Sequence, residues 1–175
     1  LNNPIYQFDL AVTTADATLN GVTITTAGTY AATDFTNFKC WYSSDAVFSP
    51  GTDVLLSTLS PVGIAGAQVF PAFTNQIITS GSTGYIFISA DLPCNAVVAN
   101  DISVDAITIA DISFVSGNKS GTANAGGLQT IIAATPNDVT APAASVANMS
   151  SSVSWTNPAG CYDEVMIVAS EGAAN

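Results

Sequence analysis

Carboxylates are the most numerous ionisable side chains in this sequence. The chain has 175 residues, with 13 Asp and Glu, two Lys, no Arg and no His, and a net charge of −11. Paired carboxylates hydrolyse glycosides when they stand roughly 5–9.5 Å apart. Asp101 and Asp105 share one face of a predicted strand, which places them about 13 Å apart. We therefore expect solvated charges, unless folding brings Asp91, Asp101 and Asp111 together.

One loop offers oxygen ligands for a hard cation. Asp45, Ser49 and Asp53 lie in or beside the turn Ser49-Pro50-Gly51. Ca²⁺ is bound by carboxylate and carbonyl oxygens, so Asp45 and Asp53 are candidate calcium ligands. No D-x-D-x-D-G pattern accompanies them, and the alternative is two solvated acids beside a turn. No other cofactor is expected.

Lys39 and Trp41 form a second candidate site. They alternate along a predicted strand with Phe38, Cys40 and Tyr42, so they lie on the opposite face from those three side chains. If that face is outward, the indole and the lysine could bind a sugar or contact a neighbouring module. The alternative is that both faces of the sheet are covered and Trp41 is partly buried.

The missing residue types exclude several function classes. Without His, the chain has no Ser-His-Asp or Cys-His pair and no imidazole metal site. Without Arg, and with Lys39 and Lys119 as the only cations, it cannot line a nucleic acid backbone. The negative charge also argues against direct binding to an anionic membrane, and no stretch of 18 apolar residues predicts a transmembrane helix.

The elements that must position these residues are strands. Apolar and polar side chains alternate with period two, as in Tyr6, Phe8 and Leu10 against Gln7 and Asp9. Turn signals, such as Asn20-Gly21, recur about every 8–15 residues, as in β-sandwiches. We expect one helical turn at 31–35 and strands at 5–12, 22–25, 38–42, 53–59, 67–73, 85–91, 101–109, 112–115, 128–133, 144–147, 151–155 and 165–169. The fold class is therefore all-β, an antiparallel β-sandwich.

Two modules are predicted. Residues 136–142 contain two prolines and no periodicity, so we interpret them as a linker. The first module is then 1–135, an Ig-like sandwich, and 143–175 begins a second one.

The second module resembles the start of a fibronectin type III domain. The residues that carry this resemblance are Ala141-Pro142, then Ser151-Ser152-Val153-Ser154-Trp155-Thr156-Asn157-Pro158, then Tyr162-Asp163-Glu164-Val165-Met166-Ile167-Val168-Ala169. The resemblance implies that Trp155 is a core residue. The last of these stretches, Tyr162 to Ala169, is similar to the third strand of the fibronectin type III variant in large secreted and cell-surface proteins of the Bacteroidota.

The first module also resembles β-sandwich modules of those proteins, many of them cargo of type IX secretion. The matching stretches are Asn37–Ser44, Leu55–Thr58, Gly84–Asp91 and Lys119–Ala123. The resemblance implies a piece of a multidomain extracellular or cell-surface protein. It implies no reaction, because such modules accompany enzymes and adhesins alike.

A fibronectin type III domain needs about seven strands in about 100 residues, by analogy with the Ig-like sandwich. The residues after Pro142 are enough for about three strands. We therefore expect that the protein continues beyond Asn175, with strand complementation by another chain as the alternative.

Export, which the resemblance implies, would favour a disulfide between Cys40 and Cys94. Cys161, the third cysteine, would then be unpaired within this chain. The alternative for Cys40 and Cys94 is two reduced and buried thiols.

The function expected from these observations is non-catalytic: a structural or adhesive module of a surface adhesin, stalk or filament. Its partners would be neighbouring β modules or copies of itself. The alternative is a carbohydrate-binding accessory region of a secreted enzyme, for which glycans would be the ligands.

Overall fold

The computed structural model describes residues 2–115, 117–133, 138–148, 150–158, 160–161 and 164–166. The chain divides into two compact units, Leu1–Ile132 and Ala133–Asn175. The described strands pair antiparallel, which confirms the predicted all-β class. The division lies three residues before the expected end of the first module at 135.

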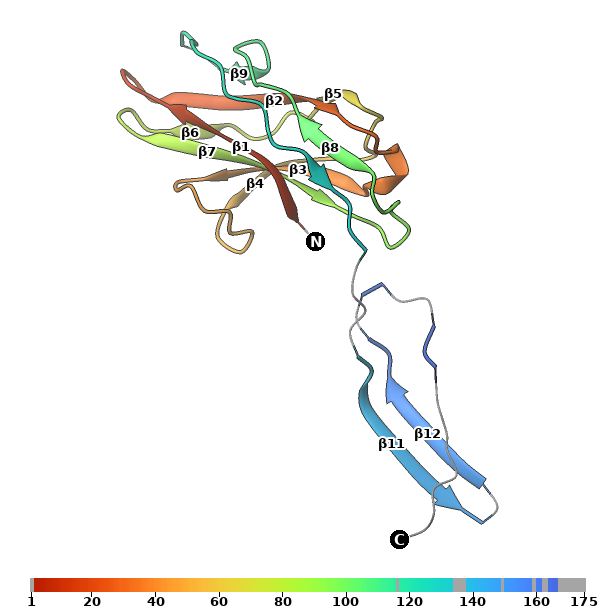
Figure 1. The fold of residues 1–175 in the computed structure, drawn as a ribbon. Helices are drawn as coiled ribbons and strands as arrows, with labels where there is room; N and C mark the ends of the chain where they lie inside the picture. The colour runs from red at the N-terminus through yellow and green to blue at the C-terminus, as the bar shows by residue number, and fades with distance from the viewer. Residues whose placement is uncertain are drawn as a thin grey trace. The chain divides into compact units, whose positions relative to one another are not determined.

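Unit 1 is a β-sandwich (Figure 1). Its first sheet has the order β1-β7-β3-β4, in which β7 pairs with both β1 and β3. The strands of this sheet are β1 (Asn3–Ala11), β3 (Asn37–Ser43), β4 (Val54–Leu59) and β7 (Thr83–Asp91). β1 and β4 are its edges.

The second sheet is organised around one long strand. β2 (Ala17–Ala27) pairs with β6 and β9 along its first half and with β5 and β8 along its second half. The partners are β5 (Gly66–Val69), β6 (Gln76–Ile78), β8 (Asp101–Val104) and β9 (Ile112–Phe114), and β10 (Gln129–Thr130) pairs with β8.

The expected turn at Asn20-Gly21 is wrong, because both residues lie inside β2. The register against β9 shifts between Leu19 and Gly21, so the dipeptide marks an irregularity in the strand instead. A side chain at position 21 would come within 3.1 Å of Ser113 Cβ, which is the close approach of a neighbouring strand that a glycine in a strand permits.

The core lies between the two sheets and consists of the apolar half of each alternating strand. Phe38, Leu19, Ile24, Ile86 and Ile88 have no exposed surface. The short helical turn predicted at 31–35 is present as a 3₁₀ helix, η1 (Ala32–Asp34). Removing this apolar surface from water is the main driving force for folding of the unit.

Unit 2 contains a two-stranded sheet in its described part, β11 (Thr140–Ala147) and β12 (Ser150–Thr156). β11 begins inside the segment that was expected to be a linker, because Thr140 pairs with Thr156. The side chain of Trp155 is partly exposed and donates from Nε1 to Asn157 Oδ1 at 2.9 Å, so it is not the buried core residue that the resemblance implied. The strand expected at 165–169 lies largely outside the described residues.

Candidate functional site

Lys39 lies in an ion pair and not on an open contact face. Its Nζ is 2.6 Å from Asp91 Oδ2, and the two side chains are 20% and 11% exposed. The same Nζ donates to Asn2 Oδ1 at 2.7 Å. Three neighbouring segments meet here: β3 carries Lys39, β7 ends at Asp91, and Asn2 precedes β1.

Asp91 also fixes the start of β1. The backbone N–H of Asn2 donates to Asp91 Oδ1 at 2.5 Å. Burial disfavours the carboxylate, but hydrogen bonds from Lys39, Asn2 and the side chain of Asn37, with the Lys39 charge, outweigh it and hold the pKa of Asp91 below its usual value. The acid is therefore ionised and paired at neutral pH.

Trp41 is buried, so the expectation of an exposed sugar platform is wrong. Its side chain is 6% exposed, and its Nε1 donates to Ser89 Oγ at 2.9 Å. Phe48, from the loop between β3 and β4, lies edge-on to the indole at 5.7 Å between ring centroids and also packs against Phe87. The loop covers this face of the sheet, as the alternative interpretation had it.

The proposed calcium ligands each fix a turn. Asp45 Oδ1 accepts the N–H of Val47 at 2.8 Å, and Asp53 Oδ2 accepts the N–H of Ser49 at 2.7 Å. Across the described ranges, no group of three or more His, Cys, Asp or Glu side chains is placed to hold a metal ion. The structure therefore gives the two carboxylates a role in the backbone of the loop, and nothing in it adds support for calcium.

The disulfide expected between Cys40 and Cys94 is wrong, and so is the unpaired state expected for Cys161. Cys94 and Cys161 are both disulfide-bonded, whereas Cys40 is a free thiol with no exposed surface. Burial raises the pKa of the Cys40 thiol far above its usual value, so it stays protonated. Cys40 points into the sandwich core, as its alternation with Lys39 and Trp41 indicates, and this position keeps it from reacting.

Asp34 is a buried carboxylate that the sequence analysis missed. It has no exposed surface and accepts three hydrogen bonds of 2.8 Å, from Ala31 N, Val97 N and Asn100 Nδ2. Burial opposes its charge, but the three donors outweigh burial and lower its pKa. One feature of the sequence could have predicted this role. Asp34 lies three residues after Ala31 in the predicted turn, where a carboxylate can accept a hydrogen bond from the backbone at the start of the turn.

Other acids act in the same way at the ends of strands. Asp101 Oδ1 accepts both the N–H and the hydroxyl of Thr29, and Asp111 Oδ2 accepts the same two groups of Thr108. Asp101 and Asp111 are therefore bound to separate turns, and Asp91 is bound to Lys39 and Asn2. None of these bonds brings Asp91, Asp101 and Asp111 into one site.

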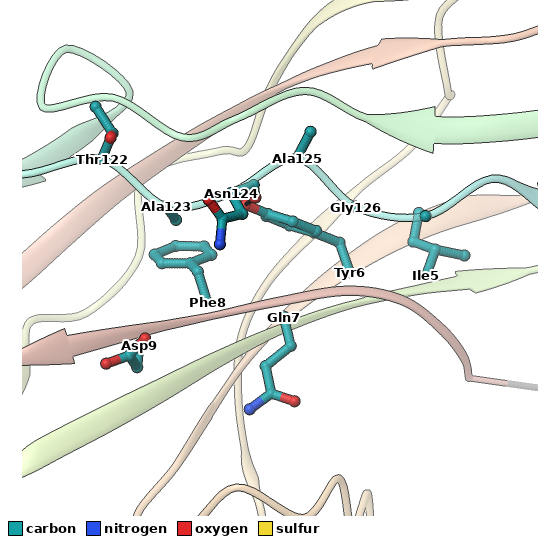
Figure 2. Close-up of a pocket in the computed structure, with 11 residues that line it drawn as sticks. Ile5, Tyr6, Gln7, Phe8, Asp9, Thr122, Ala123, Asn124, Ala125 and Gly126 are labelled. Carbon is teal, nitrogen blue, oxygen red and sulfur yellow. Dashed lines mark hydrogen bonds between the residues drawn. The ribbon is translucent and has the colours of Figure 1, made fainter.

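Two cavities open along β1. The smaller, of about 440 Å³, lies between 5–9 of β1 and 122–127. In Figure 2, Tyr6 and Phe8 point towards the latter segment, while Gln7 and Asp9 project from the opposite side of the strand. Tyr6 donates its hydroxyl proton to Asn124 O at 2.6 Å, and a side chain on Gly126 would come within 2.8 Å of the Tyr6 ring. The aromatic ring and glycine are thus closely fitted.

The larger cavity, of about 800 Å³, is lined by the second half of β1 and by 107–112 and 117–123. Phe8, Leu10, Ile112 and Phe114 supply apolar surface. Lys119, at its rim, donates from Nζ to the carbonyl oxygens of Ile109 and Ile112 at 2.6 and 2.5 Å. Both lysines of the chain are therefore engaged within unit 1.

Comparisons with known proteins identify no relative of this chain. No family model matches the chain, and neither a curated protein nor a solved structure matches it. In the described part of the chain, no helix is long and apolar enough to cross a membrane.

Proposed function

We propose that this chain is a non-catalytic structural or adhesive module of an extracellular or cell-surface protein. The observation that carries the proposal is what the charged side chains bind. Asp34, Lys39 and Asp91 form hydrogen bonds and an ion pair within unit 1, and these connect its loops and strands. An enzyme or ligand-binding site holds such groups towards a cavity. Here they stabilise the sandwich.

The state of the cysteines supports the proposed location. Disulfides persist in oxidising compartments and are rare in the cytosol. Cys94 and Cys161 are disulfide-bonded. The acidic surface, with net charge −11, keeps such a module soluble and discourages binding to nucleic acids and anionic membranes.

The proposed types of the two modules rest on the sequence resemblance described above. An Ig-like module followed by the beginning of a fibronectin type III-like domain, as in type IX secretion cargo of the Bacteroidota, fits a sandwich followed by a β hairpin. Its partners would be neighbouring β modules or further copies of the chain. The carbohydrate-binding alternative rested on Trp41, and the burial of that indole removes its main support.

Binding and turnover measurements on the full chain test the proposal. We expect no saturable glycan binding up to millimolar concentrations and no hydrolysis of a panel of chromogenic glycosides and esters. A Phe8→Ala variant opens the apolar cavity and serves as the comparison if binding is seen. Saturable glycan binding that Phe8→Ala abolishes while the chain stays folded, or turnover that copurifies with it, would contradict a structural role.

A further inference from the structure

We propose that Lys39 and Asn2 form an intramolecular amide bond, with Asp91 as the proton acceptor. This inference deepens the proposed function, on which it rests, because the bond would fasten the edge strand β1 to the interior of its sheet. It arises from one juxtaposition in unit 1: an amine, a side-chain amide and a carboxylate in direct contact.

The distances place the reacting atoms close together. Lys39 Nζ is 2.7 Å from Asn2 Oδ1. Since a carbonyl bond is about 1.23 Å long, Nζ lies within about 4 Å of the Asn2 carbonyl carbon. Reacting atoms in productive complexes are about 3–3.5 Å apart, so a small side-chain movement suffices.

Asp91 is placed to move the protons. Its Oδ2 is 2.6 Å from Lys39 Nζ, and its Oδ1 accepts the backbone N–H of Asn2. One carboxylate therefore touches the nucleophile and holds the residue that carries the electrophile. The shielding is considerable, because Lys39 and Asp91 are 20% and 11% exposed.

The reaction needs no further reagent. The Lys39 ammonium gives a proton to Asp91, and the free amine attacks the carbonyl carbon of Asn2 to form a carbon–nitrogen bond. A proton then passes from the attacking nitrogen to Nδ2, the bond from carbon to Nδ2 breaks, and ammonia leaves and takes up the proton held by Asp91. An ammonium and an amide become a substituted amide and an ammonium ion, with no oxidation.

The lowered pKa of Asp91 makes its carboxylate a weak base, so the first proton transfer is unfavourable and the reaction is slow. Slowness is no obstacle, because each molecule reacts once. The product would join the residue before β1 to β3 across β7, the strand between them (Figure 1). β1 would then be held to the sheet covalently as well as by its hydrogen bonds to β7.

Intact-mass spectrometry of the folded full chain, incubated at neutral pH, tests the proposal. We expect a mass about 17 Da below that of the sequence, equal to one ammonia. Asn2→Ala and Lys39→Arg should retain their full calculated masses. Asp91→Asn should form the bond at least about 100-fold more slowly, as expected for loss of a general base.

Matched controls are present in the same chain. Asn3→Ala and Lys119→Arg alter the neighbouring asparagine and the other lysine, and both should still lose the mass of ammonia. Circular dichroism of each variant confirms that it is folded. Trypsin digestion of the denatured protein should cut after Lys119 but not after Lys39, and should yield a peptide with Asn2 and Lys39 joined.

Three results would overturn the proposal. The first is a folded wild-type chain that keeps its full mass after days of incubation. The second is a 17 Da loss that persists in Lys39→Arg, since an imide formed by asparagine alone gives the same loss. The third is a loss of about 18 Da, which would join Lys39 to Asp91 instead. The mass reports this bond alone, so its absence would leave the binding and turnover tests of the proposed function intact.

Discussion

The two units use the same strand chemistry but differ in what their strands face. Phe38 in β3 has no exposed surface, whereas Val146 in β11 is 88% exposed. Both residues lie in antiparallel strands with regular partners. The difference shows that alternation and pairing make a strand, while a second sheet is needed to make a core.

Replacing a buried core side chain should give the largest effect and tests this comparison directly. Phe38→Ala should lower the free energy of unfolding of unit 1 by about 3–5 kcal/mol, because it leaves a cavity between the sheets. The corresponding change in unit 2, Val146→Ala, should alter the free energy of unfolding of that unit by less than about 0.5 kcal/mol. Urea unfolding of the full chain measures both, with Trp41 fluorescence reporting unit 1 and Trp155 fluorescence reporting unit 2. Equal losses would mean that the hairpin is packed as the sandwich is.

Removing the buried carboxylate should have the next largest effect. Asp34→Ala leaves Ala31 N, Val97 N and Asn100 Nδ2 without their acceptor. Buried donors without partners are costly, so we expect a loss of about 2–4 kcal/mol in the same unfolding assay. Asp45→Ala, whose carboxylate accepts one N–H in an exposed turn, is the control, with a loss under about 1 kcal/mol. A small loss for Asp34→Ala would show that its network does not hold the loop.

Acid should weaken unit 1 through the same carboxylates. The pKa values of Asp34 and Asp91 are lowered in the folded state, so the unfolded chain binds more protons in acid. Their contribution is complete above the unfolded pKa of about 3.9 and is lost as the pH falls through the lower folded values. The urea concentration at the unfolding midpoint should therefore fall as the pH is lowered below about 4. It should fall less steeply in Asp34→Asn. A midpoint that rises on acidification in that range contradicts this assignment.

The sequence was sufficient for the all-β class and for most of the strands, because alternation depends on neighbouring residues, but it missed β6 and the first half of β2. It also put Cys40 and Trp41 on opposite faces of β3, and both are buried as that alternation allows. It could not show that Phe48 returns over Trp41, since a loop's path depends on distant contacts. The Asn20-Gly21 dipeptide misled for the same reason: its pairing with β9 decides its conformation.

The candidate site was harder to predict than the fold. Asp34 was not singled out and Asp91 was expected to be solvated, but the partners of these two acids lie as far along the chain as Val97 and Lys39. Spacing within a strand carries no information on such contacts. The predicted cysteine pairing was also wrong, because an odd number of cysteines in a sequence does not indicate which one stays free.

Alkylation of the cysteines is expected to have the smallest effect on stability. It is also a direct test of the corrected cysteine assignment. Folded protein should resist iodoacetamide, because the Cys40 thiol is buried and protonated. Unfolding without reductant should label Cys40 alone, and adding reductant should label Cys94 and Cys161 as well. Cys40→Ala should show no labelling before reduction. Labelling of Cys94 or Cys161 in unreduced protein would contradict the assignment.

The central claim is that the charged groups of unit 1 hold its fold. Amide hydrogen exchange at single-residue resolution tests it most directly, at Ala31 and Val97. Neither amide belongs to a strand, but each donates to buried Asp34. The account predicts that both exchange as slowly as the amides of β3 and β7, and that Asp34→Asn speeds them while β11 and β12 exchange fast in either protein. Exchange of Ala31 and Val97 at the rate of open loops would contradict the account and leave Asp34 available for another role.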